Sequence, residues 1–247
     1  MPYSGNKMIT DSQLKQGNFL FKYRGILPLP IILGCILYYF YNYNPISNNQ
    51  YIICLCISLS GLLIRILAVG FAYHKTSGKN TRKQIAEKLN TSGIYSVLRN
   101  PLYLANYLNW LGIILLLSNT FLTIIITSLF VILYHKIILV EENFLLQKFK
   151  EEYKTYLSNT PRILPSFKNW NKPISKFNLK KSLVNIKNGL LGISLIFFLI
   201  NCIENYNLGL KIINSNWIFY FMLFSTLFYI YMKISFKILV TKNNKIS

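Results

Sequence analysis

The sequence has few acidic residues and almost no histidine. Asp and Glu together number 7 among 247 residues, against 27 Lys and Arg, and there are 2 histidines. His74 and His135 are isolated in the sequence, whereas a metal site needs several ligands together, so we expect no metal. Serine nucleophile motifs and glycine-rich nucleotide-binding loops are also absent, which weighs against serine hydrolases and P-loop enzymes.

Cysteine is also scarce, and its placement excludes two further kinds of site. The four cysteines all lie in apolar segments, where a thiol usually packs as a small hydrophobic group: Cys35, Cys54, Cys56 and Cys202. The Cys54 to Cys56 spacing suits neither a zinc site nor a redox dithiol. We therefore interpret the cysteines as packing residues.

Long apolar runs are abundant. Hydrophobic residues make up 53% of the chain and the mean hydropathy is +0.36, values that indicate a membrane protein. Crossing the hydrocarbon core takes about 20 mostly apolar residues. Six segments reach or approach this length, at 25–41, 51–73, 102–117, 121–140, 188–203 and 217–240. We predict an all-α polytopic membrane protein with about six transmembrane helices.

Basic residues alternate from loop to loop. The polar regions 1–24, 74–101, 136–187 and 233–245 contain 4, 6, 11 and 4 Lys or Arg, and the loops between these regions contain 0, 0 and 1. Because Lys and Arg accumulate in cytoplasmic loops, we predict a protein of the cytoplasmic (inner) membrane with both termini in the cytoplasm. This placement accounts for the net charge of +20, so we expect no nucleic-acid partner.

A second pattern follows the fourth apolar segment. Apolar side chains recur at amphipathic helical spacing, which predicts a cytoplasmic helix along the membrane surface: Phe144, Leu145, Phe149, Tyr153 and Tyr156. The run PRILP at 161–165 should end this helix. The predicted organisation is an N-terminal segment, a membrane core, a basic connector and a C-terminal transmembrane hairpin, at 1–24, 25–165, 166–187 and 188–247.

Polar residues collect around one predicted helix start. Proline fits the first helical turn and favours an extended residue before it, so Pro101 marks the start of a helix. Arg99, Asn100 and Tyr103 surround that start, and backbone N–H groups there suit a polar ligand. Glu141 and Glu142 follow the fourth segment. A glutamate at a helix C-terminus is disfavoured, which indicates either a longer helix or a ligand role.

Arg65 lies inside the second apolar segment. At helical rise it is roughly 12 Å from Tyr73, so its charge is either functional or snorkels towards the interface. The run 76–82, TSGKNTR, is rich in hydroxyl and basic groups that suit a phosphate, although it lacks the glycine spacing of a P-loop.

Three separated blocks share one pattern. GIYSVLRNPLY covers 93–103, Glu141-Glu142 follows one helix later, and FKEEYKTY at 149–156 precedes PRILP. Their order and spacing resemble the superfamily of isoprenylcysteine carboxyl methyltransferases and phospholipid methyltransferases, membrane enzymes that use S-adenosylmethionine. The run 70–90, with TSGKN and Gln84, is similar to bacterial lipid A 1-phosphate O-methyltransferases.

The resemblance implies roles for these residues. It implies that the first block contacts the methionine part of the cofactor and that the acidic pair and the last block close over adenosine. The expected cofactor-binding residues are Tyr95, Arg99, Asn100, Pro101, Tyr103, Asn106, Glu141, Glu142, Tyr153, Tyr156 and Arg162. Of these, Arg99 and Glu142 are the expected catalytic residues.

Three positions depart from the family pattern. The family often has His at the position of Asn100, and Gly at the positions of Ala105 and Lys150. Asparagine can donate and accept hydrogen bonds but cannot serve as an imidazole base. We therefore interpret this stretch as a cofactor-binding element rather than the source of a catalytic base.

The basic residues favour an anionic methyl acceptor. A phosphate or carboxylate oxygen is ionised at neutral pH and needs no base, whereas an amine must first lose a proton. We expect a membrane lipid, lipid A 1-phosphate-like or prenylcysteine-like, bound by Arg65, Lys79, Arg82 and Lys83. The alternatives are a phospholipid amine N-methyltransferase, a transporter or assembly subunit, and a membrane reductase.

Overall fold

The computed structural model describes residues 10–73, 84–117 and 119–243, with side chains described as far as residue 235. Within these ranges the chain is all-α and contains no strand, which confirms the predicted fold class. The helices are α1 (Asp11–Tyr23), α2 (Pro28–Tyr41), α3 (Asn48–Gly70), α4 (Ile94–Val97), α5 (Pro101–Leu117), α6 (Thr120–Asn159), α7 (Leu179–Asn207) and α8 (Trp217–Asn243).

Each of the six apolar segments forms a helix, but fewer than six are long enough to span a membrane. By length and composition α3, α6, α7 and α8 qualify alone, and the bent pair of α1 and α2 qualifies as a fifth. The chain is thus an integral membrane protein. The count falls below six because α5 has only 17 residues, and α2, with 14 residues, qualifies only together with α1. A 17-residue helix is about 25 Å long, less than the hydrocarbon core.

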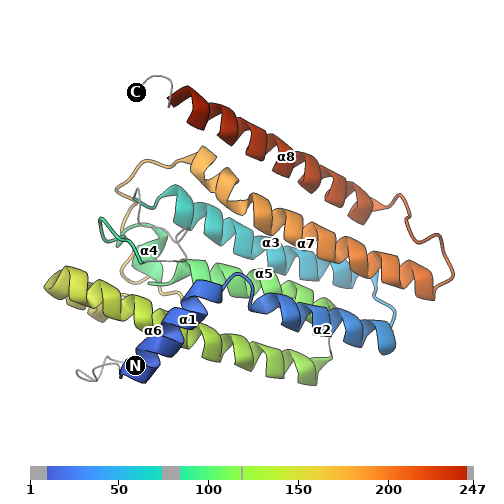
Figure 1. The fold of residues 1–247 in the computed structure, drawn as a ribbon, viewed down its shortest axis with the longest axis horizontal. Coiled ribbons are helices and arrows are strands. Elements are labelled where there is room, and N and C mark those ends of the chain that lie inside the picture. The colour runs from blue at the N-terminus through green and yellow to red at the C-terminus, as the bar shows by residue number, and fades with distance from the viewer. Residues whose placement is uncertain (1–9, 74–83, 118, 244–247) are drawn as a thin grey trace.

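The centre of the bundle is the close contact between α3 and α5 (Figure 1). A Cβ at Gly61 would lie 2.4 Å from the carbonyl oxygen of Ala105, and one at Gly112 would lie 2.2 Å from that of Cys54. Only glycine allows backbones to approach this closely. Ala105 stands where the family that the sequence resembles often has glycine, and the close approach at this position is made by Gly61 on the opposite helix.

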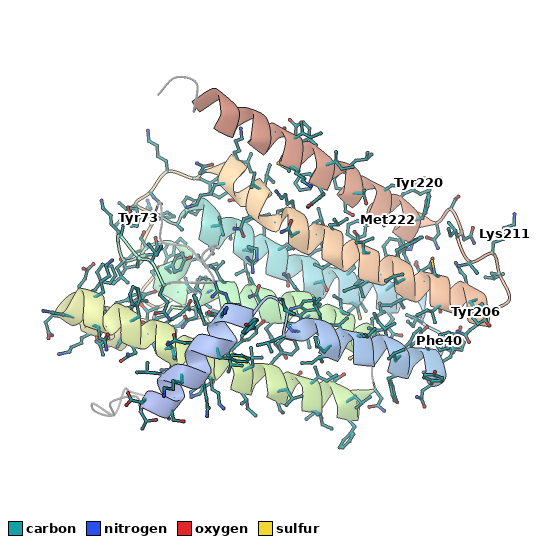
Figure 2. The ribbon with its side chains drawn as sticks, viewed as in Figure 1. Phe40, Tyr73, Tyr206, Lys211, Tyr220 and Met222 are labelled. Carbon is teal, nitrogen blue, oxygen red and sulfur yellow. The ribbon has the colours of Figure 1, made fainter. Side chains whose placement is uncertain are left out.

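The other helices surround this pair. α7 packs on α3, α8 packs on α7, α2 packs on α5 and α1 packs on α6. The connections 84–100 and 160–178 lie at one end of the bundle, and 42–47 and 208–216 lie at the other (Figure 1). Figure 2 shows Tyr73 at the first end and Phe40, Tyr206 and Lys211 at the second. The basic loops that the structure describes therefore share one end, while the orientation in the membrane stays a prediction.

Candidate functional site

The site is built on the turn from loop to helix before α5. Gly93 has φ +62 and ψ −133, a conformation that favours glycine, and it starts the single turn α4. The backbone N–H of Arg99 then donates to the carbonyl of Pro161 at 2.9 Å. α5 begins at Pro101, which confirms the predicted boundary. The loop thus holds Arg99 and Asn100 against the segment that follows α6.

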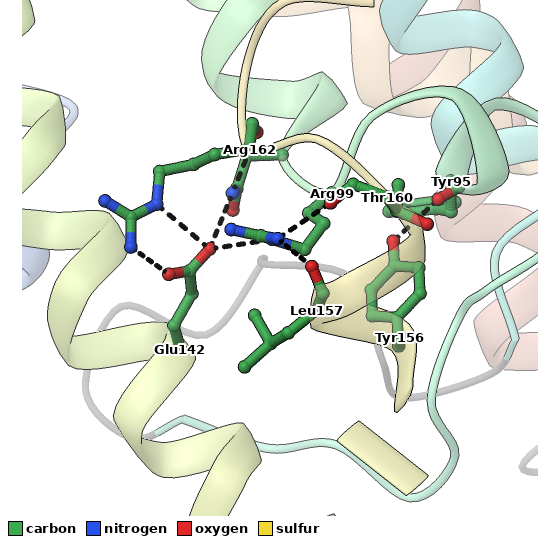
Figure 3. A network of polar contacts seen from close by, with 8 residues as sticks. Tyr95, Arg99, Glu142, Tyr156, Leu157, Thr160 and Arg162 are labelled. Carbon is green, nitrogen blue, oxygen red and sulfur yellow. Dashed lines mark hydrogen bonds and ion pairs between the residues drawn. The ribbon is translucent and has the colours of Figure 1, made fainter. Parts of the chain in front are cut away.

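Four polar residues converge at this point, and we call them the Glu142 cluster: Arg99, Asn100, Glu142 and Arg162 (Figure 3). Arg99 donates through Nε to Glu142 Oε1 at 3.1 Å, and Arg162 donates through Nη2 to Glu142 Oε2 at 2.6 Å. Asn100 Nδ2 donates to the same Oε1 at 3.4 Å and to the Arg162 carbonyl at 3.1 Å. The carboxylate is therefore bonded on both oxygens.

Burial differs within the Glu142 cluster. The side chains of Glu142 and Arg99 are 6% and 9% exposed, whereas that of Arg162 is 27% exposed. Arg99 also donates from Nη1 to the carbonyls of Leu157 and Thr160, at 2.9 and 2.7 Å. Two guanidinium groups face one carboxylate, so the cluster has an excess positive charge. Of the three charged members, Arg162 is the most exposed.

A break in α6 brings the last sequence block to the site. Lys150 has φ +44 and ψ −114 within an otherwise helical segment, and the helix resumes in a new direction. The predicted continuation to Tyr156 is confirmed, but its tyrosines do not form an open apolar face. Tyr153 is 1% exposed and packs with Leu89. Tyr156 donates through its hydroxyl to the Tyr95 carbonyl at 2.6 Å (Figure 3).

Arg65 has partners inside the bundle, in a second group that we call the Arg65 cluster: Arg65, Asn106, Asn185 and Tyr134. Its guanidinium donates to Asn185 Oδ1 at 3.1 Å and to Asn106 Oδ1. The Tyr134 hydroxyl lies close to the Asn106 side chain. Arg65 therefore binds neutral amides between helices rather than snorkelling away from them, and these contacts leave its positive charge uncompensated.

Glu141 connects the two clusters. It precedes Glu142 on α6, and its carboxylate lies close to the hydroxyl of Tyr103, whose ring centre is 5.3 Å from that of Tyr134. Burial raises the pKa of the Tyr95 hydroxyl well above its usual range, and the Glu141 carboxylate raises it further. Tyr95 is therefore neutral at physiological pH. A neutral phenol can bind a ligand but provides no base.

The structure adds residues that the sequence did not indicate. Asn185 completes the Arg65 cluster from α7. The predicted connector, 166–187, forms part of the site wall: Ser166 N–H donates to the Val97 carbonyl at 3.0 Å, and Gly93 N–H donates to the Asn171 carbonyl at 2.9 Å. α7 already starts at Leu179, within that connector. Both contacts are backbone hydrogen bonds of an irregular segment. The spacing of apolar residues in the sequence cannot predict contacts of this kind.

The expected residues thus form two adjoining groups. The first group consists of the Glu142 cluster and the aromatic residues Tyr95, Tyr153 and Tyr156. The second consists of the Arg65 cluster with Tyr103 of α5 and Glu141 of α6. Pro101 is buried at the start of α5. Lys79, Arg82 and Lys83, with the rest of the run 76–82, lie outside the described residues. The roles assigned to all these residues stay predictions.

The fold and the site define an integral membrane protein with a buried, positively charged site at one end of a helical bundle. Residues 52–152 match the model of the phospholipid methyltransferase family. This segment includes Arg65, Arg99, Asn100 and Glu142 but ends before Arg162. The segment with most of the site is therefore similar to a family of methyltransferases.

A curated relative matches a smaller part of the chain. The cobalt-zinc-cadmium resistance protein CzcN of Cupriavidus metallidurans is 35% identical over 77 residues. That alignment covers 31% of this chain and 35% of the relative, so the chain spans about a third of the relative's length. No solved structure matches the chain.

Proposed function

We propose that this protein is a membrane methyltransferase that uses S-adenosylmethionine and methylates an anionic oxygen of a lipid. The observation that supports this best is the Glu142 cluster. Four polar side chains from the α4–α5 turn, α6 and the segment after α6 converge with an excess positive charge. Burying such charges costs several kcal/mol per ion unless they are well paired, so a cluster of this kind is more typical of a ligand site than of a structural contact.

The residues present fit the cofactor. S-adenosylmethionine has an α-carboxylate, an α-ammonium group and ribose hydroxyls, and it supplies a methyl group on a positively charged sulfur. Arg99 and Arg162 are suited to a carboxylate because guanidinium groups bind it bidentately. Glu142 is suited to an ammonium or hydroxyl donor, and Asn100 can donate or accept. The buried rings of Tyr153 and Tyr156 provide an apolar wall for an adenine.

The Arg65 cluster suits the methyl acceptor. Its guanidinium carries a positive charge among neutral amides, which favours a phosphate or carboxylate headgroup such as that of lipid A 1-phosphate or a prenylcysteine. The acceptor oxygen forms a bond to the methyl carbon as the carbon–sulfur bond breaks, and the electron pair stays on sulfur. An anionic oxygen needs no base, so this chain's contribution is positioning and exclusion of water. The described residues contain no group of three or more His, Cys, Asp or Glu that could hold a metal, and nothing in that part favours metal binding.

Calorimetric titration of the detergent-solubilised protein tests the cofactor. We expect the wild type to bind S-adenosylmethionine but not NADPH. Glu142→Gln should weaken binding by about tenfold to hundredfold, because a hydrogen bond to a charged group contributes about 1.5–3 kcal/mol. Glu151→Gln is the matched control, since Glu151 is an exposed glutamate of the same helix.

Folding and binding are separated in the same experiment. Thermal unfolding shows whether each variant is folded, and Arg162→Gln, at a more exposed position, replaces Glu142→Gln if the latter is not. A folded wild type that does not bind S-adenosylmethionine would contradict the proposal. Binding that is equal in the wild type and in both variants would exclude the Glu142 cluster as the site.

Transfer of a labelled methyl group into a total lipid extract tests the acceptor. Mass spectrometry then separates methylated phosphates, carboxylates and amines. We expect label on a phosphate or a carboxylate, and loss of label in Arg65→Gln. Label on amine lipids alone would contradict the anionic acceptor and support an N-methyltransferase.

A further inference from the structure

The helix α7 contacts the Arg65 cluster from outside the segment that matches the methyltransferase family. It lies beside α3 (Figure 1), and two polar side chains on one face of α7 bond to that helix. Ser182 Oγ donates to the Ile66 carbonyl at 2.9 Å, and three residues later Asn185 Oδ1 accepts from Arg65 Nη1 at 3.1 Å. These contacts hold α7 against the half of α3 that contains Arg65.

The two contacts differ in kind. Ser182 bonds to a backbone carbonyl, a group that every residue of α3 has, whereas Asn185 bonds to a guanidinium. Asn106 of α5 accepts from Nη2 of the same guanidinium. Arg65, Asn106 and Asn185 are all half-buried. The terminal nitrogens of Arg65 are therefore held between α5 and α7, each by the oxygen of one amide.

Neither amide neutralises the guanidinium. An amide oxygen accepts a hydrogen bond but has no net charge. In the part of the chain that the structure describes, Arg65 forms no ion pair with a carboxylate. A charge away from water is costly without a partner, and an anion beside it is attracted strongly. The neutral partners thus fix the position of the guanidinium and leave its charge available to a ligand.

We propose that Asn185 determines specificity for an anionic methyl acceptor. Its oxygen positions the Arg65 guanidinium, and its neutrality keeps the positive charge available for a phosphate or carboxylate headgroup. This inference rests on the proposed function, in which Arg65 binds that headgroup. Asn185 acts through Arg65 and is therefore a positioning residue. The helix α7 thus contributes to the acceptor site in addition to crossing the membrane.

Two variants separate this role from a purely structural contact. Asn185→Asp has nearly the same shape and keeps an oxygen for Arg65, but it adds a negative charge, which the neighbouring guanidinium favours. Asn185→Leu removes the oxygen. Asn188→Asp is the matched control, because it adds the same charge at an exposed position of α7. Ser182→Ala is a second control, because it removes a contact between α7 and α3 that does not involve Arg65.

The first readout needs neither cofactor nor catalysis. Native mass spectrometry counts the dioleoyl phosphatidic acid and dioleoyl phosphatidylcholine molecules that the protein retains. Wild type and both controls should prefer phosphatidic acid, Asn185→Asp should reduce that preference about tenfold or more, and Asn185→Leu should be intermediate. A purely structural role predicts the opposite for Asn185→Asp, because a new ion pair would preserve stability and leave the preference unchanged.

Thermal unfolding shows which variants are folded. An unchanged preference in folded Asn185→Asp would overturn the proposal, and Asn185→Leu serves as the test if Asn185→Asp does not fold. An equal loss of preference in Asn188→Asp would also overturn it, because the added charge would then act without contacting Arg65.

Methyl transfer provides the second readout, with dioleoyl phosphatidic acid as the phosphate acceptor and N-acetyl-S-farnesylcysteine as the carboxylate acceptor. We expect Asn185→Asp to raise the KM for whichever acceptor the wild type uses about tenfold or more, with a smaller change in kcat. The affinity for S-adenosylmethionine should change less than twofold. A tenfold loss of cofactor affinity at an unchanged acceptor KM would place Asn185 in the cofactor site and overturn the proposal.

The two readouts distinguish failure of this inference from failure of the proposed function. If Arg65→Gln loses the preference for phosphatidic acid and neither Asn185 variant does, the role of Asn185 is contradicted and the proposed function stands. If Asn185→Asp loses the preference although the wild type transfers no methyl group, Asn185 has the positioning role in a site for anionic lipids, and the methyltransferase proposal is contradicted.

Discussion

Two buried glutamates at opposite ends of the bundle have different partners. Glu142 is bonded by two arginines and an asparagine, which come from segments far apart in the chain. Glu204, 6% exposed, accepts from the Ile46 N–H and the Tyr51 hydroxyl, each at 2.8 Å, and no Lys or Arg in the described part of the chain bonds it. Glu204 thus joins the loop before α3 to α7, whereas Glu142 lies in a group with excess charge.

Under the proposed function, this difference separates a structural carboxylate from one that takes part in ligand binding. A buried carboxylate with neutral donors is stabilised by hydrogen bonds alone, and it fixes the elements that provide them. Two arginines around one carboxylate leave binding capacity, because each guanidinium has five N–H donors. The comparison predicts that changes at Glu204 affect stability and that changes at Glu142 affect ligand binding.

The largest effect should come from Glu204→Ala. It leaves the Ile46 N–H and the Tyr51 hydroxyl unpaired in a buried place, so the free energy of unfolding should fall by about 2–4 kcal/mol. Thermal unfolding in detergent measures the loss, with the exposed Glu152→Ala as the control. S-adenosylmethionine affinity should remain within twofold of the wild type. A tenfold weaker affinity in a folded Glu204→Ala protein would break the comparison.

Double-mutant cycles sharpen the same comparison with a smaller effect. The coupling between Arg162→Met and Glu142→Gln should be about 1–2 kcal/mol in cofactor binding, because the two residues bind each other and, under the proposed function, both contact the cofactor. Tyr51→Phe with Glu204→Gln should couple in unfolding by about 1 kcal/mol and not in cofactor binding. Calorimetry and thermal unfolding of the four variants, with both double variants, provide these values. Coupling of the Tyr51 pair in cofactor binding would show that Glu204 is not purely structural.

The smallest effect concerns backbone conformation at the two ends. Two residues with positive φ can be compared: Lys150, at the end with Glu142, has φ +44, and Gly209, at the end with Glu204, has φ +68. Glycine adopts such a conformation easily, whereas lysine does so at a cost. Lys150→Gly should raise the free energy of unfolding by about 1 kcal/mol, and Gly209→Ala should lower it by a similar amount. In thermal unfolding this corresponds to a few degrees. A destabilised Lys150→Gly protein would show that the lysine side chain contributes more than its backbone conformation costs.

Much of the fold followed from sequence patterns, and part of the site did too. Apolar runs predicted α3, α6, α7 and α8, and Pro101 predicted the start of α5, because these features act on neighbouring residues. The resemblance also named Arg99, Asn100, Glu142 and Arg162, which meet in the structure. The partners of Arg65 on α5 and α7 could not be predicted, since no local pattern relates residues from separate helices.

The sequence by itself determined that this is an all-α membrane protein and that its basic loops alternate, because hydrophobicity and charge act segment by segment. Only the tertiary structure decided that Glu142 has two arginine partners and that Arg65 turns inward to two asparagines. Those outcomes depend on how α3, α5, α6 and α7 pack against one another. The close backbone contact at Gly61, for example, brings α3 and α5 together.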